Sequence, residues 1–213
     1  MNKISNKEAL VIVVAIADAI IENKEELSKI DAVFGDGDHG INMSKGFTIA
    51  KSKLDLDNMD MSAGFDVVSE VLLDEIGGSM GPLYGSFFEG LSDASKGVFD
   101  LDLNTLIKML TSGYENITEI STAKLNDKTL LDVLIPVIDD LKKSQAAEVD
   151  FKTALESMLV AIDKNLELSK NLVAKIGRAS RFQERTVGYQ DAGAMSCAII
   201  LKALAQKLIR LVG

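Results

Sequence analysis

The sequence predicts an all-α fold, a single-domain barrel or bundle of about eight antiparallel helices with a ligand site in the loops at one end. Apolar residues recur at helical spacing over long segments, no segment shows strand-like alternation, and most of the 16 glycines stand between the apolar segments. With 213 residues, 47% of them hydrophobic, the chain is long enough for one large core. No linker divides residues 1–213, so we expect one domain.

The first predicted helix begins after a capping box. Ser5 and Glu8 are spaced so that each side chain satisfies a free N–H of the first turn, and the apolar run that follows predicts a helix to about Ile30. The run over residues 9–21 is interrupted by Asp18 and is too short to span about 30 Å of hydrocarbon. We therefore expect a soluble helix and no membrane partner.

The remaining helices follow in order, each with an apolar stripe and polar or glycine-rich boundaries. They are predicted at residues 41–54, 65–76, 82–92, 104–120, 128–143, 151–174 and 194–212. Pro82 suits a first helical turn, whereas Pro136 lies inside its helix and should bend it, because proline supplies no N–H. In an up-and-down bundle, loops separated by an even number of helices share one end. The glycine-rich segments 35–46, 77–90 and 177–193 are expected to meet there.

The charge balance excludes some partners. The chain has 23 basic and 32 acidic residues, a net charge of −9, which opposes nucleic acid and anionic membranes. The single cysteine, Cys197, cannot form an internal disulfide and lies in an apolar run, so we expect a buried thiol and a cytoplasmic protein.

The acidic loop, residues 31–42, has the sequence DAVFGDGDHGIN. It places Asp31, Asp36, Asp38 and the only histidine, His39, within nine positions. Carboxylates this close repel one another unless a cation shares them, and oxygen ligands suit Mg²⁺ or Ca²⁺. An EF-hand is excluded, because this loop has no glutamate at the twelfth position. A zinc site is disfavoured, because it would need more His or Cys residues than the chain has. A solvated acidic turn is the alternative to a metal site, and a lone histidine is more often structural than catalytic.

Two further loops suit phosphate. Residues 77–85, GGSMGPLYG, end one helix and begin another, where unpaired N–H groups and the positive helix dipole attract anions. Residues 177–194 contain Arg178, Arg181 and Arg185, whose guanidinium groups pair with phosphate oxygens, and a loop of this length can close as a lid. The alternatives are a plain interhelical turn and a surface pairing of Glu184 with these arginines. The P-loop, dinucleotide-binding and Gly-x-Ser-x-Gly hydrolase motifs are absent.

Together these motifs resemble the nucleotide-binding L subunit family of dihydroxyacetone kinases. The matching segments, in chain order, are Asp31, 35–43 (GDGDHGINM), 77–78 (GG), 81–85 (GPLYG), 127–129 (DKT), Asp132 and 177–180 (GRAS). They cover nearly the whole chain.

The resemblance implies a barrel of eight antiparallel helices that holds Mg²⁺ and ADP or ATP at one end, under a lid formed by residues 177–193. Asp31, Asp36 and Asp38 would hold Mg²⁺. The nucleotide would be contacted by His39, Gly40, Ile41, Asn42, Ser79, Met80, Ser121, Leu130, Arg178, Asp191, Ala192 and Gly193. Arg178 would also be catalytic, because it adds positive charge beside the transferring phosphoryl group.

The resemblance also implies partners. In the family, the γ-phosphoryl group passes to dihydroxyacetone held covalently on a separate K subunit, and a phosphocarrier M subunit of the phosphoenolpyruvate phosphotransferase system rephosphorylates ADP in place. A free-standing L chain favours this version over ATP-dependent kinases in which the L-type domain is fused to a K domain.

This sequence departs from the family at several positions. Met80 stands where Ser is usual. Glycine is usual at Ser121, Asn126 and Gln183, and proline at Leu125 and Ala192. These departures keep open a non-catalytic regulatory or nucleotide-binding paralogue on the same fold. A metal-dependent hydrolase is a weaker third hypothesis, because the chain offers no positioned base beyond the metal ligands.

Overall fold

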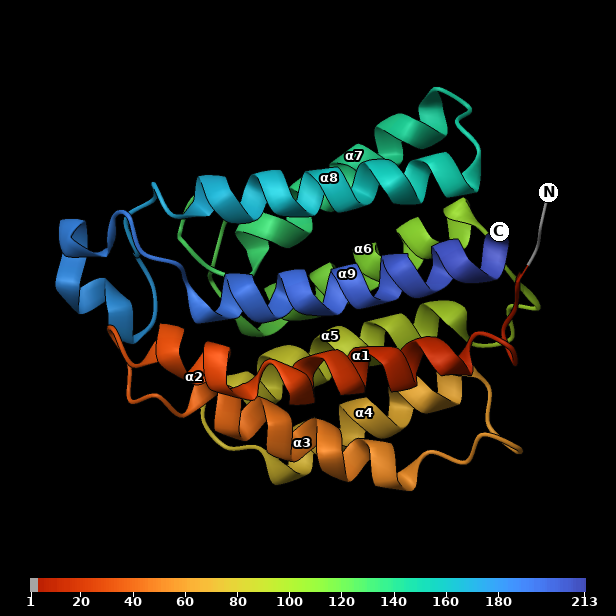
Figure 1. Cartoon of the computed structure of the whole chain (residues 1–213), viewed down its shortest axis with the longest axis horizontal. Coiled ribbons are helices and arrows are strands. Elements are labelled where there is room, and N and C mark those ends of the chain that lie inside the picture. Colours follow the sequence, from red (N-terminus) through yellow and green to blue (C-terminus); the bar gives the residue numbers. More distant parts are fainter. Residues whose placement is uncertain (1–3) are drawn as a thin grey trace.

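Long antiparallel helices run the length of the molecule, which a computed structural model describes for residues 4–213 (Figure 1). In chain order they are α1 (Leu10–Glu22), α2 (Lys24–Asp31), α3 (His39–Lys53), α4 (Met61–Glu75), α5 (Met80–Ser95), α6 (Leu103–Ile120), α7 (Leu131–Ala146), α8 (Phe151–Ser169) and α9 (Ala192–Val212). A 3₁₀ segment, η1 (Arg178–Thr186), lies between α8 and α9. The predicted all-α fold is confirmed.

Aspartates set the start of several helices. Asp60, Asp102, Asp150 and Asp191 precede α4, α6, α8 and α9, and each carboxylate accepts a hydrogen bond from the backbone N–H three residues later. Such caps satisfy N–H groups that have no partner inside the helix. The capping box before α1 also forms, because Ser5 N donates to Glu8 Oε2 and Glu8 N donates to Ser5 Oγ.

The first predicted helix is interrupted, which corrects its expected extent to Ile30. Asn23 separates α1 from α2, with φ −92° and ψ 12°, and its Nδ2 donates to the carbonyl oxygen of Ala19 at 2.8 Å. Asparagine competes for backbone hydrogen bonds in this way and so favours helix ends. The apolar pattern continues through the break because both helices pack on the same core.

Further helix boundaries, and one strand pair, differ from expectation. The helix expected to start at Lys128 starts at Leu131, because Asn126 and Lys128 have positive φ values of 72° and 62°. The helix expected to reach Ala174 ends at Ser169. No strand was expected, yet β1 (Ile4–Ser5) pairs with β2 (Asp100–Leu101) in antiparallel register. Two residues are too few for an alternating pattern.

A continuous hydrophobic core joins the helices. Phe88 packs edge-on against Phe47, with ring centroids 5.6 Å apart, and also contacts Phe65. Helices α5 and α6 come unusually close, since a Cβ added at Gly90 would lie 2.5 Å from the backbone nitrogen of Gly113. Pro136 lies inside α7 as predicted. Within residues 4–213, no helix has the length and hydropathy needed to cross a membrane.

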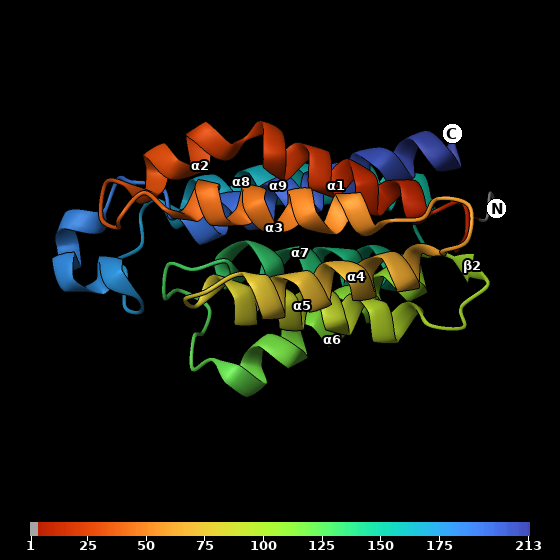
Figure 2. The ribbon, with the colours of Figure 1, turned by 90° about the horizontal axis from the view of Figure 1, so that it is seen from below.

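The two ends of the bundle differ. The C-terminal end of α9 lies at one end, with β2, and η1 projects beyond the helices at the other (Figures 1 and 2). Cys197 is buried inside α9, as expected, and burial raises the pKa of its thiol. The long loops that carry the sequence motifs lie at the η1 end.

Candidate functional site

Four helix starts surround one cavity at the η1 end. The cavity has a volume of about 530 Å³, and the residues that precede α3, α5, α7 and α9 all line it, namely Asp38, Ser79, Leu130 and Asp191. The first N–H groups of a helix lack internal partners, and its dipole is positive at that end. The cavity therefore suits an anionic ligand, although the chain as a whole is acidic.

Most of the predicted site residues meet at this cavity. Those that line it are Asp31, Asp36, Asp38, His39, Asn42, Ser79, Met80, Ser121, Leu130, Arg178, Asp191, Ala192 and Gly193. Gly40 and Ile41 do not line it. Gly40 faces α2, where an added Cβ would meet the carbonyl oxygen of Lys24 at 2.0 Å, and the Ile41 side chain is 49% exposed on the outer surface.

The acidic loop lies on one wall of the cavity. Its carboxylates do not converge, and among residues 4–213 no three His, Cys, Asp or Glu side chains are grouped closely enough to share a metal ion. Asp36 instead pairs with Arg178, and that hydrogen bond lowers the pKa of Asp36. Asp31 Oδ2 accepts from the backbone N–H of His39 at 3.4 Å. The loop thus carries the oxygen ligands that Mg²⁺ prefers, but one of them is engaged by the lid.

The His39 ring is directed into the protein. It is 7% exposed, and its Nε2 lies 2.9 Å from Ser196 Oγ. Ser196 Oγ is 2.6 Å from the Tyr84 hydroxyl, which donates to the carbonyl oxygen of Gly193 at 3.0 Å. Burial lowers the pKa of His39 to about 4, so the ring is neutral at physiological pH. This chain of hydrogen bonds joins the starts of α3, α5 and α9 beneath the cavity.

The lid, residues 177–193, contacts the acidic loop through aromatic rings. The Phe34 ring lies 5.1 Å from that of Phe182 and 5.2 Å from that of Tyr189, measured between centroids. The guanidinium of Arg185 lies over the Phe182 ring at 5.5 Å. The Phe34–Phe182 contact and the Asp36–Arg178 pair hold η1 against the cavity mouth.

Asp191 and Lys128 are charged groups inside the cavity wall. Asp191 Oδ1 accepts from Ala194 N at 2.8 Å, and burial raises the pKa of this carboxyl to about 6. Lys128 is 3% exposed; burial lowers its pKa, and the nearby Asp191 and Asp132 partly offset that effect.

Lys128 and Thr129, which both line the cavity, were predicted to have no role beyond their place in the segments that carry the resemblance. The carbonyl groups that Lys128 binds lie 41 to 44 residues away in the chain, so no local pattern marks it.

Comparison with known proteins gives consistent matches. The sequence pattern of the DAK2 domain matches residues 33–206. The ADP-binding subunit of the PEP-dependent dihydroxyacetone kinase of Escherichia coli is 33% identical over 190 residues, which cover 88% of this chain and 90% of that protein. The corresponding subunit of the PTS-dependent enzyme of Lactococcus lactis is also 33% identical over 190 residues, 89% of this chain and 91% of that protein.

Longer proteins also match. The L-erythrulose kinase of Pectobacterium atrosepticum is 30% identical over 198 residues, 91% of this chain but 33% of that protein. Among solved structures, the dihydroxyacetone kinase of C. freundii in complex with AMP-PNP and Mg²⁺ superposes with a TM-score of 0.68 at 22% identity. The match covers 96% of this chain and 34% of that one, and it shows a shared fold.

Proposed function

The chain belongs to the DAK2 domain family, in the group of dihydroxyacetone kinase L subunits, and from this premise we propose that its cavity binds Mg²⁺ with ADP or ATP for phosphoryl transfer. The acceptor that we propose is dihydroxyacetone held on a partner K subunit. The relatives from E. coli and L. lactis are ADP-binding subunits of kinases, which supports a nucleotide-binding kinase subunit.

The observation that carries the proposal is the ring of helix starts around one cavity. The starts of α3, α5, α7 and α9, which carry the positive ends of the helix dipoles, border the same space, and this arrangement suits a chain of phosphates. The volume of about 530 Å³ is in the range of nucleotide-sized pockets. Arg178 adds the only arginine side chain among the residues that line this cavity.

Asp31, Asp36 and Asp38 would hold the metal ion by converging on it, with Asp36 released from Arg178, because they are three hard oxygen donors on one wall of the cavity. When bound, Mg²⁺ supplies neutralisation of the phosphate charge. Arg178 stands beside the same carboxylates and contributes a forked donor to the phosphoryl oxygens. The protein thus contributes positioning and electrostatic stabilisation.

For the phosphoryl donor, we propose a phosphocarrier M subunit that rephosphorylates bound ADP. The relatives from E. coli and L. lactis, which this chain covers almost fully, are PEP- or PTS-dependent. Of the L-erythrulose kinase of P. atrosepticum, the match covers 33%. The proposed location is the cytoplasm, with neither nucleic acid nor membrane as a partner.

A regulatory paralogue is the alternative, and one observation favours it. Met80 lines the cavity at the start of α5, where the family usually has Ser, so a hydroxyl donor is missing from the phosphate-binding turn. Such a protein would hold nucleotide without phosphoryl transfer.

The test combines bound nucleotide with turnover. Mass spectrometry of the denatured protein should find released ADP. Dihydroxyacetone phosphate should form with a K subunit plus phosphocarrier and phosphoenolpyruvate, and not with the chain alone. Turnover by the chain alone would refute the shared site, whereas bound Mg-ADP without turnover in any mixture would favour the regulatory paralogue.

Arg178→Ala should lower kcat by about 100-fold or more, because one positioned charge near the transferring group is removed. Arg181→Ala is the matched control, since Arg181 is exposed on the same lid and does not line the cavity. Equal losses in the two variants would count against a catalytic role for Arg178.

A further inference from the structure

A buried ammonium joins the end of α8 to the cavity wall. Lys128 Nζ donates to the carbonyl oxygens of Ser169, Lys170 and Leu172, at 3.3, 2.9 and 3.0 Å. The last carbonyls of a helix have no internal partners, and three donors on one lysine match three acceptors. Burying an ammonium is costly without such partners, so this geometry is tightly defined.

The turn that carries Lys128 is held from both sides. Asn126 and Lys128 have positive φ values, which non-glycine residues rarely adopt. The Asp132 carboxylate accepts from the backbone N–H of Asn126 through Oδ1 and from that of Thr129 through Oδ2. These bonds offset the cost of the left-handed backbone. The same turn leads directly to Thr129 and Leu130 on the cavity wall.

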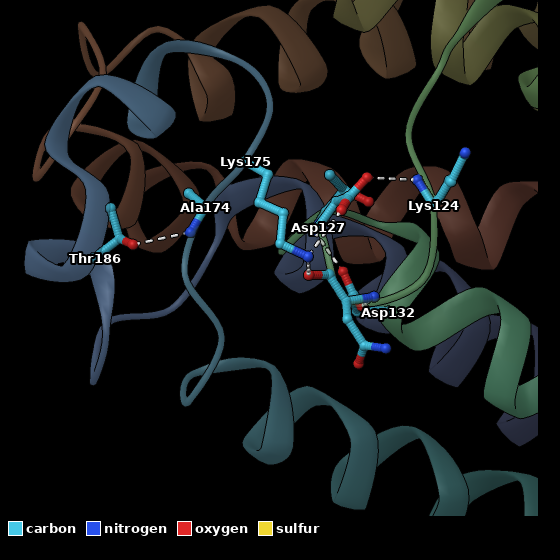
Figure 3. Close-up of polar contacts among 8 residues, drawn as sticks. Lys124, Asp127, Asp132, Ala174, Lys175 and Thr186 are labelled. Carbon is cyan, nitrogen blue, oxygen red and sulfur yellow. Dashed lines mark hydrogen bonds and ion pairs between the residues drawn. The ribbon is translucent and has the colours of Figure 1, made fainter.

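The segment that leads into the lid, residues 170–176, is attached to this turn, and we call it the outgoing limb. Lys175 N donates to the carbonyl oxygen of Asp127 at 3.1 Å, and Lys175 Nζ donates to that of Asn126 at 2.8 Å. Lys175 Nζ also lies 3.3 Å from Asp127 Oδ1. In Figure 3, Lys175 extends from the lid limb to Asp127, with Asp132 next to it in the same cluster.

Residues 186–188 of the lid, which we call the returning limb, are attached to the outgoing limb. Thr186 Oγ1 accepts from Ala174 N at 3.0 Å, as Figure 3 also shows, and Gly188 N donates to the carbonyl oxygen of Lys170 at 2.8 Å. That carbonyl also accepts from Lys128. Both limbs of the lid, the end of α8 and the turn at 126–129 therefore form one hydrogen-bonded unit, which we call the lid root.

We propose that Lys128 is a positioning residue for phosphoryl transfer, whose ammonium fixes the lid root to the cavity wall and thereby sets where Arg178 stands over the nucleotide. This inference rests on the proposed function. Lys128 needs no contact with the reacting atoms for this role, because it acts through the end of α8, where the carbonyl oxygen of Lys170 also accepts from Gly188 N of the lid. Without the ammonium, η1 would keep its own contacts and the Lys175 bonds to the turn, but the lid root would lose three hydrogen bonds and be held less firmly.

The test uses the full chain and Lys128→Met, which keeps an unbranched side chain one atom shorter and removes the ammonium. The matched control is Lys170→Met, which removes the same charge from the same region but loses only a pair with exposed Glu167. Hydrogen exchange is measured without nucleotide on amides 174–188 and, as an internal reference, on α4. Amide exchange reports local opening.

In Lys128→Met, amides 174–188 should exchange about tenfold faster or more, because three hydrogen bonds to a charged donor are lost, while α4 keeps its rate. Lys170→Met should match the wild type. Exchange in Lys128→Met equal to that in Lys170→Met would overturn the proposal, and so would equal acceleration in α4, because Lys128 would then only stabilise the whole fold.

Lys175→Met covers the case in which Lys128→Met does not fold, since the Lys175 side chain is largely exposed. It should accelerate exchange of the same amides by a smaller factor, and unchanged exchange there would overturn the common lid root.

Assays with the partner subunits complete the test. In Lys128→Met, kcat should fall about tenfold and the Kd for Mg-ADP should change less than about threefold, because lid placement acts on the transition state. A loss of affinity for Mg-ADP by the same factor as the loss of kcat would overturn a positioning role. If wild-type protein bound no Mg-ADP, the proposed function would be refuted. The hydrogen-exchange result, which is measured without nucleotide, would still test whether Lys128 fixes the lid root.

Discussion

At the scale of the residue, Asp36 decides whether the acidic loop is a metal site. Its carboxylate pairs with Arg178 across the cavity mouth, and both side chains are substantially exposed. Asp36→Asn removes one full ligand charge, so the affinity for Mg-ADP should fall about tenfold or more while the fold survives. Calorimetric titration with ADP and Mg²⁺ measures this change.

Asp57→Asn is the control for Asp36→Asn, because Asp57 is an exposed aspartate between α3 and α4, outside the cavity lining. An affinity in Asp36→Asn equal to that of the control would remove Asp36 from the metal site. The three carboxylates would then be a solvated acidic turn.

Asp191 gives the stability of the ligand-free protein a pH dependence. Burial raises the pKa of this carboxyl from 3.8 to about 6, so the folded state binds its proton more tightly than the unfolded state. The free energy of unfolding of the wild type, relative to Asp191→Asn, should therefore be highest near pH 4 and fall as the pH rises through about 6. The fall should amount to a few kcal/mol, at about 1.4 kcal/mol for each pKa unit.

Urea titrations of both proteins between pH 4 and 7 check this difference. Asparagine remains a good cap for α9, so helix capping is preserved in the variant. A constant difference across this pH range would show that Asp191 keeps an ordinary pKa in the folded protein.

At the scale of the element, the lid is held by few contacts. Phe34 of the acidic loop packs against both Phe182 and Tyr189, and such ring pairs contribute about 0.5–1.5 kcal/mol each. Phe34→Ala removes both contacts, so η1 should detach more often. Trypsin cleavage after Arg181 and Arg185 under native conditions should become about tenfold faster, as local opening is favoured.

Phe99→Ala is the matched control, because Phe99 is 82% exposed and lies beside β2, at the opposite end from the lid. If the two variants were cleaved at the same rate, the aromatic cluster would not hold the lid. Mg-ADP should slow cleavage in the wild type, since a ligand beneath the lid favours the closed arrangement.

At the scale of the whole molecule, the ligand would connect elements far apart in the chain. The cavity is lined from the acidic loop to the start of α9, so binding should stabilise the fold as a unit. At a ligand concentration of 100 times Kd, the gain is about 2.7 kcal/mol, which corresponds to about 5–10 °C in Tm for a chain of this size. Mg²⁺ with ADP should therefore raise Tm more than either alone.

Differential scanning calorimetry with ADP, Mg²⁺, both together, and AMP without metal measures this effect. The comparison of Mg-ADP with metal-free AMP tests the acidic loop as well as the cavity. A Tm increase with metal-free AMP as large as that with Mg-ADP would mean that the three aspartates are not organised around an ion that bridges phosphates.

Local patterns in the sequence were sufficient for most of the fold. Helical periodicity and the capping box at Ser5 and Glu8 predicted the helices in their correct order, because both depend on residues within one or two turns. The acidic loop, the Gly77 turn and the lid were recognisable for a related reason. Their unusual residues stand close together, and the bundle topology then brings helix starts to one end.

Contacts over long sequence separations were decided only by the tertiary structure. Asp36 meets Arg178 across 142 residues, Ser196 binds the His39 ring across 157, and Lys128 caps a helix that ends about 40 residues later. The β1–β2 pair is of the same kind, because its two short strands lie far apart in the chain. A side chain's partner depends on which elements the core brings together, so the acidic loop alone did not show that the lid already engages one of its carboxylates.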